Sequence, residues 1–113
     1  MGNLGYEKPG TPHGRHPSQR ELGWIAGFLE GEGCFNTAGS NPGTQRVTAV
    51  QKQREPLLRL QELLGGRVYP RFRDGCFGWS VTGARARGIM LTLYALMSPR
   101  RKDQIRAALW FTK

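Results

Sequence analysis

The sequence has few cysteines, few acidic residues and no long apolar run, and each shortage excludes a class of protein. Cys34 and Cys76 are too few for a disulfide framework or a four-cysteine zinc site, and we expect both to be reduced thiols. No apolar segment approaches the roughly 20 residues that span a bilayer, and the N-terminus lacks the apolar stretch of a secretion signal. We therefore expect an intracellular, non-secreted protein with no membrane partner.

Basic residues outnumber acidic residues by 17 to 8, which gives the 113-residue chain a formal net charge of +9. Arg supplies 13 of the 17 positive charges, and its planar guanidinium suits phosphate oxygens and base edges better than a lysine ammonium does. The apolar fraction of 38% is enough for one small core and too high for a disordered chain. This balance favours a polyanionic partner, although a ribosomal-type protein would have a similar charge.

The first 20 residues differ in composition from the remainder of the chain. They contain 3 prolines, 4 glycines and both histidines, with almost no aliphatic side chains. Three basic residues and one acidic residue make this stretch positively charged. We predict a flexible basic arm over residues 1–20, either a disordered tail or a segment that lies along DNA, and a single folded domain over residues 21–113.

Beyond residue 20 the hydrophobic periodicity alternates between that of helices and that of strands. It predicts strands over residues 33–37, 46–52, 67–73 and 76–81, and helices over residues 22–30, 56–64, 84–97 and after Pro99. Gly65-Gly66 would end the second helix, Asp74-Gly75 would connect the last two strands, and Pro70 favours an edge or a bulge. The order α-β-β-α-β-β-α-α is typical of an α+β fold with one antiparallel sheet and helices on one face.

Glycine recurs every four residues in the first predicted helix. Gly23, Gly27 and Gly31 would lie on one helix face, although glycine costs a helix about 1 kcal/mol relative to alanine. Such a face lets another helix approach closely, and the chain offers no second glycine-striped helix. The pattern predicts a two-fold symmetric homodimer through this face. A glycine-rich loop is the alternative, which the intervening apolar residues disfavour.

Two acidic residues, Glu30 and Glu32, lie at the C-terminal end of the same predicted helix. Carboxylates are unfavourable there because the helix dipole is negative at that end. A divalent cation would offset the repulsion, and a carboxylate with backbone carbonyls, waters and phosphate oxygens is a usual Mg²⁺ environment. A two-fold axis would bring two such carboxylates together. The alternative is that both glutamates are solvated loop residues.

Residues 25–33, with the sequence IAGFLEGEG, resemble the LAGLIDADG motif of homing endonucleases. Further matches follow in the family's order, over about residues 21–111: Val50-Gln51-Lys52, a leucine-rich helix stopping at Gly65-Gly66, an aromatic strand ending at Trp79, and residues 100–104. The resemblance implies an α-β-β-α-β-β-α unit whose saddle-shaped antiparallel sheet straddles DNA. It also implies a homodimer that acts on a palindromic or pseudo-palindromic double-stranded site, encoded in an intron or another mobile element.

The same resemblance implies a metal-dependent nuclease site. Glu32 takes the place of the motif's last acid, often Asp in the family, and would bind a metal together with the Gly31 carbonyl. Gln51 resembles the polar residue that positions water. Arg101 takes the place of a family lysine, with Lys102 beside it, and its role would be electrostatic because Arg keeps its proton. The implied cofactor is Mg²⁺, with Mn²⁺ as a substitute, and the implied reaction is phosphodiester hydrolysis that leaves short 3′ overhangs.

Sequence specificity would come from one face of the sheet in the major groove, where two-stranded ribbons can read base edges. An arginine row without acids between its members is unfavourable on a solvated face, and a polyanion would relieve the repulsion. Alternation along the four predicted strands assigns ten residues to this face: Asn36, Ala38, Arg46, Thr48, Arg67, Tyr69, Arg71, Arg73, Gly78 and Ser80.

Two other functions remain open on the sequence alone. A DNA-binding regulator without cleavage, or an RNA maturase with intron RNA as its partner, could use the same scaffold. Arginine in place of the usual lysine at Arg101 favours that alternative. A small RNA-binding or ribosome-associated domain could resemble the family by chance, and a stable monomer would favour it.

Overall fold

A five-stranded antiparallel sheet forms the centre of the computed structural model, which describes residues 7–8, 16–39 and 43–110. Its strand order is β1-β4-β5-β3-β2, and the strands are β1 (Glu7–Lys8), β2 (Gly33–Ala38), β3 (Thr44–Gln51), β4 (Gly66–Arg71) and β5 (Cys76–Thr82). The helices are α1 (Gln19–Glu32), α2 (Glu55–Leu64), α3 (Ala84–Leu93) and α4 (Pro99–Trp110), and a short 3-10 helix, η2 (Tyr94–Leu96), lies between the last two. None of the helices in the described ranges is both long enough and apolar enough to cross a membrane.

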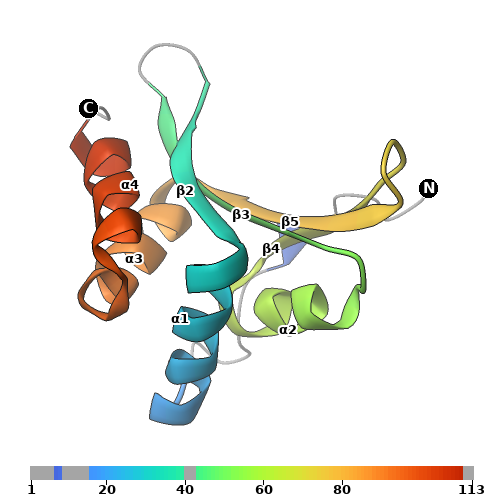
Figure 1. Ribbon diagram of the computed structural model, residues 1–113, viewed down its shortest axis with the longest axis horizontal. Coiled ribbons are helices and arrows are strands. Elements are labelled where there is room, and N and C mark those ends of the chain that lie inside the picture. The colour runs from blue at the N-terminus through green and yellow to red at the C-terminus, as the bar shows by residue number, and fades with distance from the viewer. Residues whose placement is uncertain (1–6, 9–15, 40–42, 111–113) are drawn as a thin grey trace.

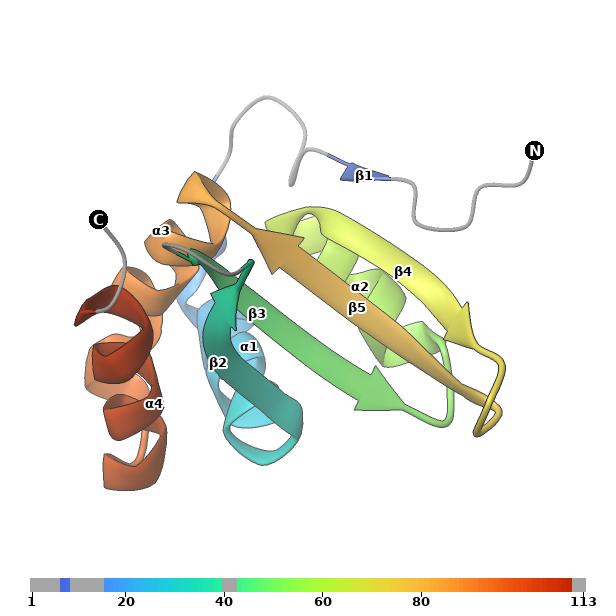
Figure 2. The same ribbon diagram turned by 90° about the horizontal axis from the view of Figure 1, so that it is seen from above.

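The element order from α1 to α4 confirms the predicted α-β-β-α-β-β-α-α arrangement and the α+β fold class. Two antiparallel hairpins, β2–β3 and β4–β5, join at the centre through antiparallel pairing of β3 with β5. Helices α1 and α2 lie under one face of the sheet, while α4 packs against β2 and α3 against β3 and β5 (Figures 1 and 2). The two hairpins rise above the other face, so that this open face is concave (Figure 1).

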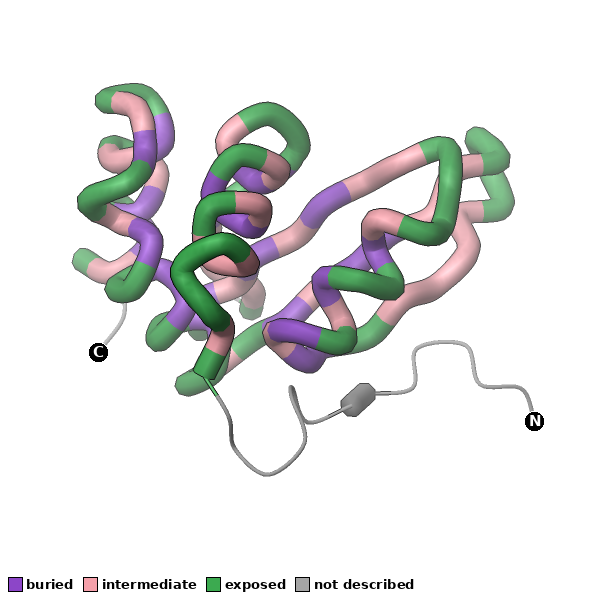
Figure 3. The backbone as a smooth tube through the Cα atoms, turned by 90° about the horizontal axis from the view of Figure 1, so that it is seen from below, coloured by how far each residue is buried: buried purple, intermediate pink, exposed green. Residues whose placement is uncertain are grey.

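The core lies between the helices and the covered face of the sheet. Alternate strand residues, among them Val47, Ala49 and Val81, are buried there. Trp79 is fully buried at the centre, and its indole Nε1 donates a hydrogen bond of 2.9 Å to the Gly65 carbonyl. The burial pattern alternates along the strands and recurs every three or four residues on the helices, as a half-covered sheet requires (Figure 3).

The N-terminal boundary differs from the prediction of a flexible arm over residues 1–20. Helix α1 already begins at Gln19, because Ser18 and Glu21 form a capping box. The Ser18 hydroxyl accepts from the Glu21 amide at 3.1 Å, and the Glu21 carboxylate accepts from the Ser18 amide at 2.8 Å. Residues Glu7–Lys8 form β1 on the outer edge of β4. The remainder of the predicted arm, residues 1–6 and 9–15, lies outside the described residues.

Two other boundaries also differ from prediction. The helix expected over residues 84–97 ends at Leu93 and continues only as η2, where the Met97 amide donates to the Tyr94 carbonyl and Met97 itself is already extended. Strand β4 ends at Arg71 rather than at Arg73. The hairpin turn is longer than Asp74-Gly75 alone, since the Gly75 amide donates to the Arg71 carbonyl and the Cys76 amide donates to the Asp74 carboxylate, both at 3.0 Å.

Gly66 is a position where we expect even alanine to destabilise the fold. Its φ is +90°, and a Cβ there would lie 2.6 Å from the Ser80 carbonyl oxygen and 3.0 Å from Trp79 Nε1. The left-handed backbone costs alanine about 1–2 kcal/mol, and the clash with neighbouring backbone adds about as much again. We expect Gly66→Ala to lower the free energy of unfolding by about 2–4 kcal/mol, measured by urea denaturation.

Gly75→Ala is the matched control for this prediction. Gly75 also has a positive φ, +72°, but nothing lies within 4 Å of its added Cβ. It should therefore lose only the backbone contribution, about 1–2 kcal/mol. Equal losses in the two variants would show that the contact with β5 is unimportant.

Candidate nucleic-acid interface and nuclease site

The open face of the sheet carries the positions that strand alternation assigned to DNA contact. The register places Asn36, Arg46 and Thr82 in one row, and Thr48, Ser80 and Arg67 in the next. Their strand neighbours are buried on the opposite, helix-covered face. Nine of the ten predicted positions lie in strands on the open face: Asn36, Ala38, Arg46, Thr48, Arg67, Tyr69, Arg71, Gly78 and Ser80.

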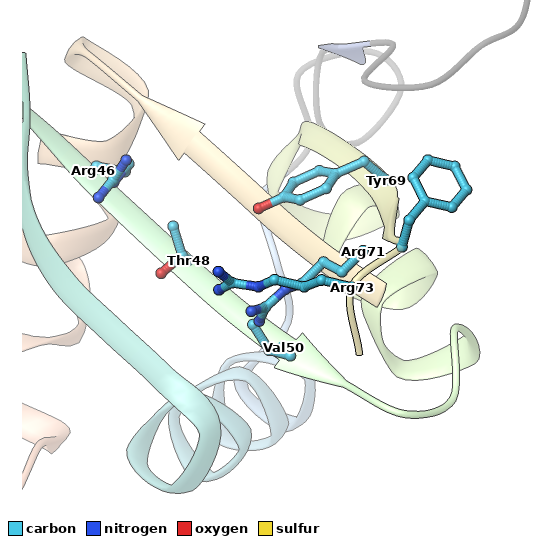
Figure 4. Close-up of a pocket in the computed structure, with 7 residues that line it drawn as sticks. Arg46, Thr48, Val50, Tyr69, Arg71 and Arg73 are labelled. Carbon is cyan, nitrogen blue, oxygen red and sulfur yellow. The ribbon is translucent and has the colours of Figure 1, made fainter. Parts of the chain in front are cut away.

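A shallow cavity of about 630 Å³ lies on this face between β3 and the β4–β5 hairpin. Arg71 and Arg73 extend from the hairpin over the sheet toward Thr48 and Val50 of β3 (Figure 4). Arg73, the tenth predicted position, thus reaches the open face although it lies beyond the end of β4. With Arg46 of β3, the cavity therefore combines three guanidinium groups with polar and apolar side chains, which suits a nucleic acid.

Sequence reasoning missed two residues that line this cavity, Val50 and Phe72. Val50 follows Arg46 and Thr48 at the strand period, so alternation alone could have found it. Strand alternation over residues 67–73 would place Phe72 on the face opposite the arginines, with Val68 and Pro70. It instead lies in the turn after β4 and is 83% exposed, so that an aromatic ring stands beside the two arginines.

Tyr69 and Gly78 form a packed pair on the open face. The two residues are opposite each other on β4 and β5, and a Cβ at Gly78 would lie 2.6 Å from the Tyr69 ring. The ring therefore lies across β5, where the absence of a side chain makes room for it. The Arg67 guanidinium lies 5.7 Å from the centre of the same ring. Gly78 thus acts by allowing Tyr69 its position rather than by contacting a ligand through a side chain.

One carboxylate lies beside the arginines of the hairpin. Asp74 accepts from Arg71, with 3.2 Å between Nη2 and Oδ2. The backbone hydrogen bond from Cys76, together with the charges of Arg71 and Arg73, holds the pKa of Asp74 below its ordinary value. An exposed pair of this kind stabilises the fold only slightly, and it partly neutralises one member of the arginine row.

The glycine face of α1 is uncovered. Gly23, Gly27 and Gly31 are all exposed, and a Cβ added to any of them would meet nothing within 4 Å. Beside this face, Trp24 and Phe28 stack with their ring centres 5.3 Å apart, and the Arg59 guanidinium lies 4.2 Å from the Trp24 ring. The described part of one chain therefore gives these glycines no packing role, and the helix has room for a close neighbour.

Glu32 is the last residue of α1 and is exposed next to this glycine face. The last four carbonyls of a helix have no helical donor. The Leu29 carbonyl accepts from the Gly33 amide, and the Glu30 carbonyl accepts from Arg101 Nε at 2.9 Å. The other two of these four carbonyls are those of Gly31 and Glu32, which lie at the same helix end as the Glu32 side chain.

These oxygens fit a hard divalent cation such as Mg²⁺ in kind, because Mg²⁺ prefers carboxylate and carbonyl oxygens. One chain supplies few of them: no group of three His, Cys, Asp or Glu side chains that could hold a metal occurs among the residues that the structure describes. A cation bound by Glu32 and the Gly31 carbonyl would therefore need further ligands from a second copy or from a phosphate.

Arg101, which the resemblance places in the catalytic site, lies at the junction of α1 and α4. It is only 5% exposed, its Nε donates to the Glu30 carbonyl, and its Nη1 donates to Gln104 at 3.0 Å. These bonds hold the start of α4 against the end of α1, so that Arg101 is a positioning residue. Lys102 lies on the same helix, with its Nζ 5.4 Å from the Tyr94 ring, and is directed toward that ring.

Gln51 remains near the predicted site. It ends β3, and the pairing of Gly33 with Ala49 places it at the same end of the sheet as Glu32. The structure thus brings Gln51 and Glu32 together at one sheet end.

Glu30 links the same two helices. Its Oε1 accepts from the Ser98 amide at 2.9 Å, at the start of α4. Hydrogen bonds from the side chain and the backbone of Ser98 hold the pKa of the Glu30 carboxyl below its ordinary value of 4.5. Glu30 is therefore a structural acid, separate in role from Glu32.

We expect Glu30→Gln to lower the free energy of unfolding by about 1 kcal/mol at pH 7. A carboxyl with a lowered pKa stabilises the folded state above its unfolded pKa, and this contribution disappears as the pH falls through the folded pKa. The difference between wild type and variant should therefore shrink as the pH falls below 4.5 in urea denaturation series. Glu62→Gln, an exposed change on α2, is the control, and a Glu30→Gln difference that stays constant down to pH 3 would contradict the assignment.

Comparison with known proteins identifies the fold. No protein-family model matches the sequence, and no curated protein is significantly similar to it. Solved structures do match. One is the homing endonuclease I-CvuI in complex with its target in the presence of 2 mM Ca, which is 23% identical with a TM-score of 0.68. The match covers 82% of this chain and 66% of that chain.

Two further matches are an archaeal intron-encoded homing endonuclease, I-Vdi141I, complexed with DNA, and a group I intron-encoded homing endonuclease, I-CeuI, complexed with DNA. I-Vdi141I is 20% identical with a TM-score of 0.63 and matches over 77% of this chain and 65% of its own. I-CeuI is 16% identical with a TM-score of 0.63 and matches over 80% of this chain and 53% of its own. The chain has the LAGLIDADG homing endonuclease fold, and its match spans about two thirds of the length of the I-CvuI chain.

Proposed function

We propose that this protein is a site-specific DNA endonuclease of the LAGLIDADG homing type that works as a homodimer on a palindromic or pseudo-palindromic site. The observation that carries the proposal is the exposed glycine face of α1, which leads directly to the exposed carboxylate of Glu32. Packing this face against its copy across a two-fold axis would bring two such carboxylates together. Neither feature has a role within the described part of a single chain.

The charge of the open face supports a nucleic-acid substrate. Arg46, Arg67, Arg71 and Arg73 lie on that face, Asp74 is paired with Arg71, and the whole chain carries a net charge of +9. Arginine and tyrosine side chains on a concave sheet can contact both phosphates and base edges in the major groove. The solved structures with this fold include complexes with DNA, which is consistent with a double-stranded DNA partner.

The residues at the end of α1 have distinct tasks in this proposal. Glu32 and the Gly31 carbonyl would hold Mg²⁺ or Mn²⁺, which supplies charge stabilisation to a phosphodiester and activates water. Gln51, at the same sheet end, would orient a water by hydrogen bonding. Arg101 and Glu30 fix the end of α1 against α4, so that the Glu32 carboxylate is presented at a constant position.

Selection of cleaved molecules from a random library of double-stranded DNA tests the proposal. We expect the full chain with Mg²⁺ to recover a pseudo-palindromic site cut on both strands with short 3′ overhangs, and to recover nothing with EDTA. Cleavage that persists in EDTA would contradict metal dependence. Cleavage of unrelated sequences at the same rate as the selected site would contradict site specificity.

A second candidate, a non-cleaving DNA-binding regulator or an RNA maturase, is favoured by one observation. Two of the three guanidinium nitrogens of Arg101 donate to the Glu30 carbonyl and to Gln104, which would limit its contact with a scissile phosphate. Enrichment of a DNA sequence by binding, without cutting in Mg²⁺ or Mn²⁺, would support the regulator. Binding of structured intron RNA in preference to DNA would support the maturase.

A further inference from the structure

Arg46 differs from the other arginines of the open face in how its side chain is held. It is half-buried on β3, directly opposite Asn36 of β2, and its Nε donates to Asn36 Oδ1 at 3.2 Å. The Asn36 amide nitrogen in turn lies 3.5 Å from Cys34 Sγ as a donor. An uncharged acceptor thus fixes the inner nitrogen of the guanidinium.

The other arginines are placed differently. Arg71 is paired with Asp74, Arg67 lies against the Tyr69 ring, and Arg73 extends from the exposed turn. Ion pairs among the described residues involve Arg71 and Arg106 but not Arg46. Arg46 therefore has no carboxylate partner among the described residues, and the bond to Asn36 uses only Nε and neither of the two terminal nitrogens.

This arrangement suits a base edge better than a phosphate. Two parallel N–H groups of arginine match the O6 and N7 acceptors of guanine in the major groove, which is the commonest specific contact between proteins and DNA. A guanidinium that is already oriented loses less conformational entropy when it makes that contact. A phosphate contact does not require this orientation, and exposed arginines such as Arg73 can make it.

We propose that Arg46, positioned by Asn36, reads one guanine in each half of the DNA target. The inference rests on the proposed function, because it assumes that the open face enters the major groove of double-stranded DNA. In a two-fold symmetric dimer the same guanine would occur at equal distances on both sides of the centre of the site. Asn36 acts through Arg46 and is a positioning residue.

The test is selection by binding in Ca²⁺ from random double-stranded DNA, followed by sequencing, for wild type and four variants of the full chain. Arg46→Ala should erase the preference for guanine at one symmetric pair of positions, where the wild type discriminates by on the order of tenfold or more. Arg46→Lys keeps the charge but lacks the planar fork, and should lose most of that preference with little change in overall affinity. Asn36→Ala should weaken the preference several-fold.

Arg85→Ala is the matched control, since it removes one exposed arginine from α3, which is not among the strand positions assigned to the open face. It should leave the selected sequence unchanged. Thermal unfolding of each variant identifies losses that come from misfolding. The assignment of Arg46 would be overturned if Arg46→Lys kept the wild-type guanine preference, or if that preference survived Arg46→Ala. Either result would leave the proposed endonuclease function standing. Failure of the wild type to enrich any DNA sequence would overturn both proposals.

Discussion

Replacing Glu32 with glutamine should abolish DNA cleavage and leave DNA binding intact. The change keeps the size of the side chain and removes the one exposed carboxylate at the end of α1 that could bind a metal. Removing a residue that only hydrogen-bonds to a metal ligand lowers metal affinity or activity by about 10–100-fold. Removing the ligand itself should therefore lower the cleavage rate by more than about 100-fold. The measurement is the rate of cutting of the selected site in Mg²⁺, with binding measured separately in EDTA.

Two controls make this result specific. Glu32→Asp keeps a carboxylate, shortened by one methylene, and should retain part of the activity. Glu62→Gln removes an exposed carboxylate from α2 and should cut at the wild-type rate. Cutting by Glu32→Gln at the wild-type rate would remove Glu32 from the reaction and would place the metal elsewhere.

The second large effect is expected from a bulky residue on the glycine face. Gly27 lies in the middle of α1, and a Cβ added there would meet nothing within 4 Å among the described residues of a single chain. Gly27→Leu should therefore fold normally and even gain helix propensity of somewhat under 1 kcal/mol. It should prevent close approach of a second α1, so that the chain becomes monomeric and no longer cuts both strands.

Gly88→Leu is the matched control for Gly27→Leu. Gly88 is also an exposed helical glycine, on α3, with nothing within 4 Å of an added Cβ. Sedimentation equilibrium should show a dimer for wild type and Gly88→Leu, and a monomer for Gly27→Leu. A wild type that is monomeric at all concentrations, with and without DNA, would rule out the homodimer. Retained dimerisation of Gly27→Leu would place the dimer interface on another surface.

These variants also separate the two functions that share the scaffold. A homodimeric endonuclease needs the glycine face and Glu32 together, whereas a regulator that only binds DNA needs the open face and has no use for the Glu32 carboxylate. A protein in which Glu32→Gln changes nothing while Gly27→Leu weakens binding would fit the regulator. The buried position of Arg101 makes this comparison informative, because it leaves Glu32 as the main catalytic candidate among the described residues.

The sequence by itself determined the secondary structure and the faces of the sheet. Both signals are local: the period of two along residues 46–52 and 67–71 separated the open face from the core, and the four-residue spacing of glycine defined one face of α1. The helix start at Gln19 was also encoded locally, in the capping box formed by Ser18 and Glu21. The composition of residues 1–20 does not reveal it, because Ser18 lies at the end of a proline- and glycine-rich segment.

Only the tertiary structure showed which groups hold Arg101 and Arg46. The bond from Arg101 to the Glu30 carbonyl joins residues 71 positions apart, and no periodicity within α4 reports which distant carbonyl a buried arginine will reach. The bond from Arg46 to Asn36 depends on the register of β2 against β3, since a slip of one residue would turn either side chain to the other face of the sheet. Spacing therefore defined which residues share a surface, while the packing of distant segments decided which of their side chains are held by other residues.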